Sequence, residues 1–252
     1  MVSMPTDPKK ALWFSIERKR LSVEQWATTR IHTALKESVQ GVIDNMEQFG
    51  VQDALNDLRS EISEAPMVEA YQDVYERIGV AFARQSFNAF KSRKDDQAVE
   101  DEWVRFMREF AVVEAGQRIA GVNDTTLKRI RAVLENGVKE GLGIEEIARN
   151  MQESTAIHRV RARAIARTEI VSASNKGSLL GAQSTGLQLK KEWISTRDRR
   201  TRPDHLDADG QIVDFNEKFN VGGEEAEYPG DPSLSAANSI NCRCAVASIP
   251  YD

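Results

Sequence analysis

The stretch HRVRARAIARTEIVSASNKGSLLGAQSTG, residues 158–186, marks the point at which the chain changes from one kind of pattern to another. It is rich in alanine and small polar residues, which predicts a long helix over about residues 157–180 that ends in glycine and serine. Long helical periodicities precede it and short, turn-bounded segments follow it. The fold class expected is α+β, with a mainly helical N-terminal and central region and a small, loop-rich β unit at the C-terminus.

Upstream of this stretch, apolar residues recur at helical spacing. One helix is predicted over residues 23–49, a second from Pro66 to about residue 91, a third around Trp103 and a fourth that begins at Asn123 or Asp124. Gly141 and Gly143 separate the fourth from a short fifth helix. The stripe of the first helix is formed by Leu35, Val39, Val42, Ile43, Met46 and Phe49.

Downstream of Gly186 the segments LKKEWIST and GQIVDF alternate apolar and polar residues between turn residues, which predicts short strands. CRCAVASI, residues 242–249, is a third strand candidate, and EEAEYPGDPSLSAANSIN is expected to be a loop. The change of pattern predicts two parts, a helical N-terminal region over residues 1–115 and a second domain over residues 116–252 with helices followed by short strands.

The overall composition is that of an ordinary folded protein. The chain has 252 residues, of which 40% are hydrophobic and 29% charged, with a formal net charge of -5. The negative balance argues against a broad field for nonspecific nucleic-acid binding. No apolar run approaches the length of about 20 residues that spans a bilayer, so no membrane partner is expected, and a reducing cytoplasm makes a stable disulfide improbable.

Cys242 and Cys244 are the only cysteines and leave two interpretations open. On a regular strand they would share a face about 6.6 Å apart, too far for a disulfide, whose Cβ atoms lie about 3.8 Å apart. Packing of two small thiols is favoured, and no cofactor is then needed. The alternative is zinc held by both thiolates, with His205 as third ligand and an aspartate as fourth.

His205 is also a candidate general base because several aspartates lie near it in the sequence. No nucleophile elbow, zinc-protease motif, phosphate loop or dinucleotide fingerprint accompanies it, so no catalytic residue is assigned. Two arginine clusters offer candidate phosphate contacts, which are Arg159, Arg161, Arg163, Arg199 and Arg200. Arg167 and Glu169 do not face each other on a helix, so each is expected to have a different partner in a buried ion-pair network.

Four segments, in this order and at this spacing, resemble the phage Mu F-like minor head protein family, also called the head morphogenesis domain, over about residues 115–252. They are GLGIEEIA, IARTEIVSASNKG, KKEWISTRDRRTRPDHLDADGQIV and NCRC. The family pattern maps onto Thr168, Glu169, Trp193, Asp198, Arg202, His205, Gly210, Asn241, Cys242, Arg243 and Cys244. A departure is the long acidic insert at residues 216–240.

The resemblance implies a minor capsid component of a tailed bacteriophage virion, inside the head and near the portal, that aids procapsid assembly or DNA delivery. Its expected partners are the portal protein and other head proteins, with genomic DNA as a further candidate, and it is expected in the host cytoplasm during assembly. Exposed apolar stripes on the N-terminal helices are expected to form the docking face.

Two other functional classes stay open. The first is a nuclease or ADP-ribosyltransferase-like enzyme that uses His205, although the chain ends soon after Cys244 and an effector domain is not expected there. The second is a DNA-binding accessory protein that uses the arginine clusters.

Overall fold

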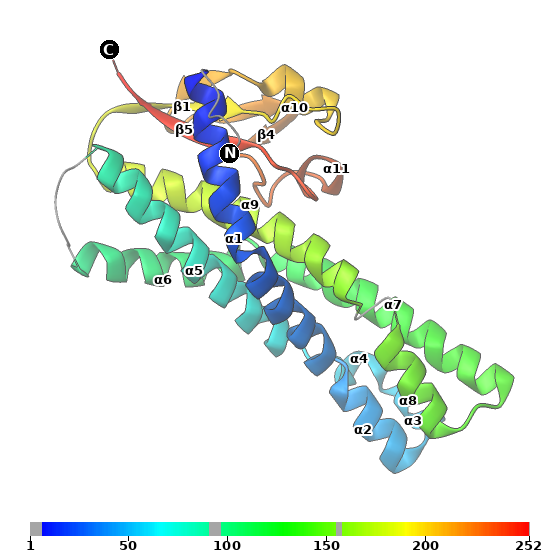
Figure 1. Cartoon of the computed structure of the whole chain (residues 1–252). Coiled ribbons are helices and arrows are strands. Elements are labelled where there is room, and N and C mark those ends of the chain that lie inside the picture. The colour runs from blue at the N-terminus through cyan, green and yellow to red at the C-terminus, as the bar shows by residue number, and fades with distance from the viewer. Residues whose placement is uncertain (1–6, 91–96, 155–157, 252) are drawn as a thin grey trace.

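The computed structural model describes residues 7–90, 97–154 and 158–251, which form a long helical arm with a small sheet at one end (Figure 1). The α+β class is confirmed. The helices before the sheet are α1 (Pro8–Glu37), α2 (Gln40–Phe49), α3 (Val51–Asn56), α4 (Leu58–Glu61), α5 (Ala65–Phe90), α6 (Gln97–Val113), α7 (Gly116–Glu140), α8 (Ile144–Glu153) and α9 (Arg159–Gln183). The C-terminal unit contains β1 (Leu189–Ile194), α10 (Pro203–Ala208), β2 (Ile212–Asp214), β3 (Phe219–Val221), β4 (Glu224–Ala226), α11 (Ala236–Ser239) and β5 (Ala245–Pro250).

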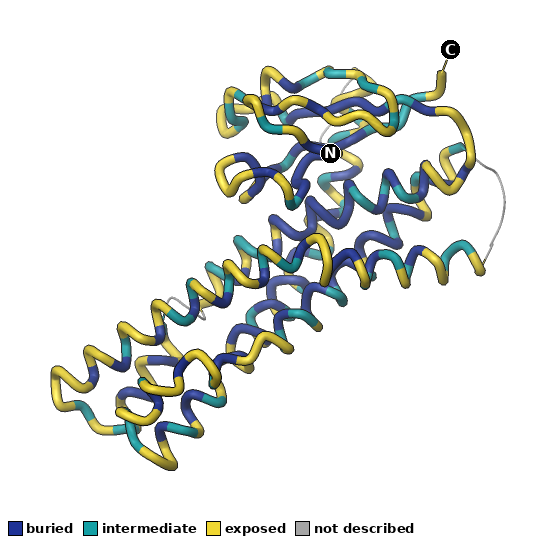
Figure 2. Tube along the Cα trace, turned by 180° about the vertical axis from the view of Figure 1, so that it is seen from behind, coloured by how far each residue is buried: buried dark blue, intermediate teal, exposed yellow. Residues whose placement is uncertain are grey.

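The centre of the arm is α9, which packs against both α1 and α5. Figure 2 shows buried residues along the inner faces of these helices and exposed residues along their outer faces. At the far end of the arm, α2, α3 and α4 lie with α8 and the end of α7 (Figure 1). The helix α7 ends at Gly141, whose left-handed φ of 66° and backbone N–H form its C-terminal cap.

The backbones of α5 and α9 approach unusually closely at two glycines. A Cβ atom on Gly177 would lie 2.1 Å from the carbonyl oxygen of Gly79, and one on Gly181 would lie 2.0 Å from that of Ala83. Both distances are far below any van der Waals contact, so a side chain at either position would force the helices apart. The glycines therefore fix the distance between the two central helices.

The sheet crosses one end of the arm. Its strand order is β2-β1-β5, with both pairs antiparallel, and Trp193 of β1 lies opposite Val246 of β5. A separate hairpin pairs β3 with β4, and β4 lies at the start of the segment predicted to be a loop. Helix α1 begins beside this unit, where Lys9 forms an ion pair with Glu192 of β1.

Several predicted boundaries are wrong. The first predicted helix is two helices, because the chain breaks at Ser38 and Val39, and α1 starts at Pro8, where the Asp7 side chain accepts a hydrogen bond from the N–H of Lys9. The fourth helix starts at Gly116 and not at Asn123, and Asn123 is buried within it. The predicted start of the long helix at Ile157 lies outside the described residues.

The apolar stripes of the N-terminal helices face inward, so the expectation that they form an exposed docking face is wrong. Leu35, Val42 and Met46 are fully buried, and the described part of residues 1–115 shares one continuous hydrophobic core with α9 and the C-terminal unit. Residues at the ends of the stripes are exposed, with Phe49 at the end of α2 at 59% and Val113 at the end of α6 at 65%.

The division at residues 115 and 116 stays a prediction. The boundary falls between α6 and α7, although α1 and α5 from the first part pack on α9 from the second. Within the described residues, no helix is both long and apolar enough to cross a bilayer.

The close approach of α5 and α9 leads to a stability prediction. We expect Gly181→Ala to lower the free energy of unfolding by about 3 kcal/mol, because its methyl group overlaps backbone atoms that cannot move alone. Gly121→Ala in α7 is the matched control, since no atom lies within 4 Å of its Cβ position, and it should be neutral or stabilising by about 0.5 kcal/mol. Urea unfolding of both variants checks this, and equal midpoints would contradict it.

Candidate functional site

The candidate site is a buried cluster of three side chains in the C-terminal unit. His205 Nδ1 lies 3.3 Å from Cys244 Sγ and 3.7 Å from Cys242 Sγ. The potential ligand atoms of the three residues all lie within 4.8 Å of one another, and each residue is 2% exposed. The structure thus brings together the three residues that the sequence offered as metal ligands. The predicted fourth ligand, an aspartate, is not in the cluster among the described residues.

The prediction that both cysteines lie on a strand is wrong. Strand β5 begins at Ala245, and Cys242 and Cys244 lie in the loop before it. Asn241 has a left-handed φ of 55°, which turns the chain at this point, and the N–H of Cys244 donates to Cys242 Sγ over 3.4 Å. The separation expected on a strand therefore does not apply, and both thiols face the same imidazole. Both cysteines are free.

Arg20 of α1 holds this loop in place from the opposite end of the sequence. Its guanidinium is buried and donates to the carbonyl oxygens of Cys244, over 3.2 Å, and Arg243, over 3.3 Å. It also donates to Ser174 and Asn175 of α9, over 2.8 and 2.9 Å. One side chain therefore joins α1, α9 and the cysteine loop.

Asn175 adds a second anchor to the same loop. Its amide nitrogen donates to the carbonyl oxygens of Cys244 and Pro229, and its oxygen accepts from the N–H of Val246. These backbone groups lie where no partner strand reaches them, so the amide replaces a sheet ladder.

The two thiols have different acidities. The hydrogen bond with Cys244 lowers the pKa of Cys242 well below its ordinary value, and the hydrogen bond with His205 acts in the same direction. The hydrogen bond with Cys242 raises the pKa of Cys244, and burial raises it further. Cys242 is thus the thiol that ionises first.

Helix α10 and Trp193 position the imidazole. Pro203 opens α10, and the N–H of Gly210, whose φ is 82°, donates to the carbonyl of Trp193 just after the helix. The fully buried ring of Trp193 meets the ring of His205 edge-to-face at 5.7 Å. His205 Nε2 is buried with no hydrogen-bond partner among the described residues.

Other signature residues tie the cysteine loop to the rest of the unit. The carboxylate of Asp198 accepts two hydrogen bonds from Arg243, at 2.6 and 2.7 Å, and this contact lowers the pKa of Asp198 well below its ordinary value. Arg202 donates to the carbonyl of Ile240. The N–H of Asn241 donates to the hydroxyl of Thr168 in α9.

Glu169 forms a second buried network, as the sequence predicted. It accepts from Tyr75 at 2.8 Å and pairs with Arg118 at 3.2 Å, and Arg118 also donates to the carbonyls of Gly230 and Asp231. Arg167 pairs instead with Glu24 of α1 at 2.9 Å. The prediction that Arg167 and Glu169 have different partners is confirmed.

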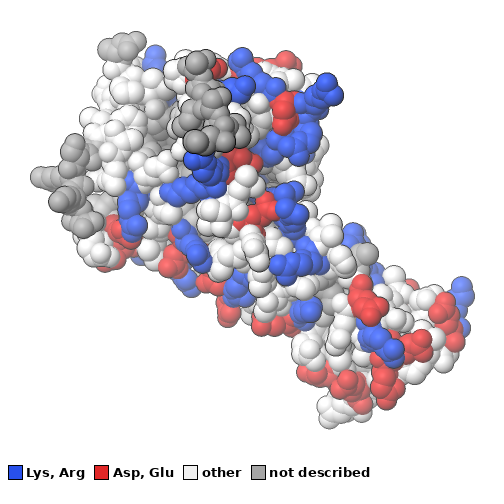
Figure 3. All heavy atoms as spheres, viewed as in Figure 1, with Lys and Arg blue, Asp and Glu red and all other residues white. Residues whose placement is uncertain are grey.

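The candidate phosphate-binding arginines do not form one free patch. Arg161 donates to Thr126 and the carbonyl of Val122, and burial lowers its pKa to about 10, while Arg163 pairs with Glu24 and Arg159 contacts Thr29. Arg199 is exposed, and Arg200 lies 3.7 Å from Asp198. Figure 3 shows basic side chains gathered on the C-terminal unit near α10, and mixed charges along the arm.

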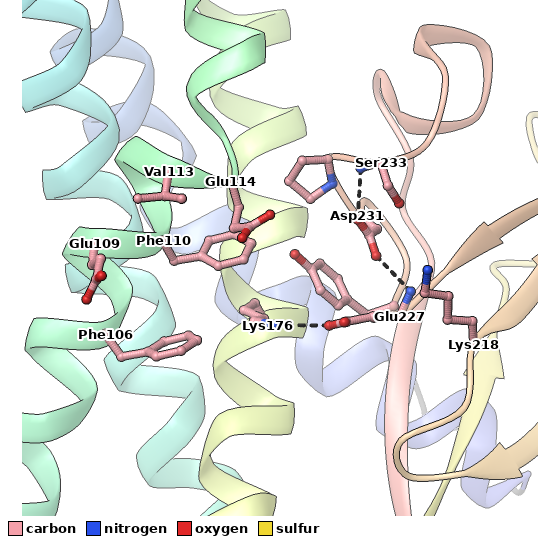
Figure 4. Close-up of a pocket in the computed structure, with 12 residues that line it drawn as sticks. Phe106, Glu109, Phe110, Val113, Glu114, Lys176, Lys218, Glu227, Asp231 and Ser233 are labelled. Atoms are coloured by element: carbon pink, nitrogen blue, oxygen red, sulfur yellow. Dashed lines mark hydrogen bonds and ion pairs between the residues drawn. The ribbon is translucent and has the colours of Figure 1, made fainter.

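A separate pocket of about 410 Å³ lies between α6 and the loop after β4 (Figure 4). Lys176 of α9 lies at its centre and pairs with Glu227 at 3.1 Å. The same ammonium group lies over the rings of Phe106, Phe110 and Tyr228. Through these contacts, Lys176 joins α6, α9 and the C-terminal unit.

Comparison with known proteins agrees with the resemblance in the sequence. Residues 128–247 match the family described as "Phage Mu protein F like protein". This region is therefore similar to the phage Mu F-like family, and it includes α9, strands β1 to β4, the start of β5 and the whole His–Cys–Cys cluster.

Three curated relatives share part of this chain. A protein of Bacillus subtilis printed as "Uncharacterized protein YqbB" is 28% identical over 48% of this chain and 41% of its own length. The "NAD(+)--arginine ADP-ribosyltransferase EFV" of Enterococcus faecalis is 31% identical over 53% of this chain and 28% of its own. "Minor head protein GP7" of Bacillus phage SPP1 is 28% identical over 52% of this chain and 41% of its own.

The chain thus spans less than half the length of these relatives. No solved structure matches it.

The residues that support the cluster could not be predicted from the sequence. Arg20 lies in the charged run ERKR, where nothing distinguishes it from its exposed neighbour Arg18, and Asn175 is one of many small polar residues in α9. Arg118 likewise carried no signal. Their roles follow from contacts between segments far apart in the sequence.

The position of Arg20 leads to a second prediction. We expect Arg20→Met to lower the free energy of unfolding by about 2 kcal/mol, because buried hydrogen bonds to the cysteine loop and α9 are lost. Arg18→Met, on the exposed face of the same helix, should change it by less than about 0.5 kcal/mol. Chemical denaturation measures both, and a stable Arg20→Met protein would show that the loop does not depend on this anchor.

Proposed function

We propose that this chain is a minor head protein of a tailed bacteriophage that acts by binding and takes part in head morphogenesis. It resides inside the virion head, beside the portal, after assembly in the host cytoplasm. The observation that carries the proposal is the phage Mu F-like match over residues 128–247, which covers most of the C-terminal unit. The minor head protein of phage SPP1, similar over 52% of this chain, supports the same conclusion.

The arrangement of the signature residues supports binding over catalysis. Asp198, Arg202 and Asn241 make internal contacts that hold the cysteine loop, and Glu169 is engaged by a tyrosine and an arginine. His205, the candidate general base, is 2% exposed. A general base has to reach the proton that it removes, and this imidazole faces two thiols of its own chain instead.

An enzymatic function is the second candidate, because one relative is an NAD(+)--arginine ADP-ribosyltransferase. The similar segment covers 28% of that protein. A similarity that covers so small a share of a protein gives weak support for transferring its activity. For this chain, the enzymatic function therefore has less support than the head function.

The head function is tested on particles made by the genome that encodes this chain. We expect mass spectrometry to find the chain in purified heads and not in tails, at few copies relative to the major capsid protein. Coexpression with the portal protein of the same genome should allow the two to be purified together. Absence of the chain from heads would contradict the proposal.

Two controls separate the alternatives. Nuclease treatment should leave the portal complex intact, whereas loss of the complex, with retention on a DNA column that falls steeply as salt rises, would favour the DNA-binding function. Incubation with NAD and an arginine analogue should release no nicotinamide. Release that His205→Gln abolishes at unchanged stability would favour the enzyme.

A further inference from the structure

The strongest unassigned feature of the molecule is the convergence of one imidazole and two thiols in its interior. His205 comes from α10, and the cysteines lie 37 and 39 residues later in the chain. Sulfur and imidazole nitrogen are the donors that zinc prefers in proteins. We propose that His205 Nδ1 and the thiolates of Cys242 and Cys244 bind a zinc ion.

The distances in the cluster fit zinc. Bonds of about 2.3 Å to sulfur and about 2.0 Å to nitrogen, at tetrahedral angles, place the nitrogen about 3.5 Å from each sulfur. The two observed separations are 3.3 and 3.7 Å. The nitrogen-to-sulfur distances therefore lie within a few tenths of an ångström of those in a zinc site, and all the potential ligand atoms lie within 4.8 Å of one another.

The donor set suits zinc and excludes the common hard cations. The cluster contains no carboxylate among the described residues, and magnesium and calcium require oxygen ligands. Two thiolates and one neutral imidazole balance the charge of a divalent ion.

The surroundings hold the cysteine loop and the imidazole ring in place. The N–H of Cys244 donates to Cys242 Sγ, Asn175 and Arg20 hold the carbonyl of Cys244, and Trp193 packs against the imidazole. Such contacts fix ligand orientation before the ion arrives. The cysteine loop is thus shaped by groups outside the cluster.

A route to the site is present. Cys242 lines a pocket of about 500 Å³ together with Arg20, Asn241 and Arg243. Tetrahedral zinc with three protein ligands takes its fourth ligand from solvent, and this pocket supplies it. The ion would link α10 to the loop before β5, two segments that otherwise meet through Trp193 and Arg202.

The test uses the full chain, freed of any affinity tag because histidine tags bind metals. We expect elemental analysis to find about one zinc per chain, and replacement by Co²⁺ to give the absorption bands of a tetrahedral cobalt–thiolate centre. Because Cys242 and Cys244 are the only cysteines, thiolate-to-cobalt absorption can come from no other residues. This measurement needs no variant, so it decides the matter even if a substituted chain fails to fold.

Matched variants assign the ligands. The double variant Cys242→Ser/Cys244→Ser should lower zinc affinity by at least about 100-fold. His205→Cys should retain the metal, with stronger thiolate-to-cobalt absorption, a rescue that simple packing would not produce. His158→Asn is the control, because His158 is an exposed N-cap of α9, where asparagine can replace it, and zinc should be unchanged.

Three outcomes would overturn the proposal. In the first, the folded chain has two free thiols and binds neither Zn²⁺ nor Co²⁺ at micromolar concentration, which leaves packing as the role of the cysteines. In the second, zinc binds equally well to the double serine variant and therefore lies elsewhere. Oxidation of both thiols to a disulfide in the freshly purified protein would also contradict it.

Discussion

The contact between the backbones of α5 and α9 is the constraint on which the other packing depends. Gly177 and Gly181 allow α9 to lie against α5 at a distance that no side chain would permit. From there α9 packs against α1, where its Ser174 accepts from Arg20, and its Asn175 reaches the C-terminal unit. A helix buried on several sides needs small residues rather than a single apolar stripe, which explains its alanines, serines and glycines.

The sequence predicted the elements well and their partners poorly. Helical stripes and the strand pattern after Gly186 depend on local periodicity, which is visible in one segment at a time. The start of α7 was missed because Asn123, a good capping residue, is buried inside the helix instead. The hairpin of β3 and β4 was missed because its acidic and glycine-rich segment resembles a loop.

The three central residues of the site were found from their chemistry alone, since histidine and cysteine are rare in this chain. Their geometry did not follow from the sequence, because the pattern predicts a strand from Cys242, whereas β5 begins only at Ala245. The conformation of the cysteine loop depends on hydrogen bonds from the side chains of Arg20 and Asn175 to its backbone. Contacts of this kind, between residues far apart in the sequence, leave no periodic signal.

The anchoring of the cysteine loop by Arg20 couples two regions that sequence comparison treats separately. The family match begins at residue 128, so it contains the loop but not the arginine that satisfies its carbonyls. A protein that carries the matched region behind a different N-terminal segment has to supply another donor at this position. Grafting this C-terminal unit onto a new partner therefore requires transferring the first turns of α1 as well, up to Arg20, as one structural module.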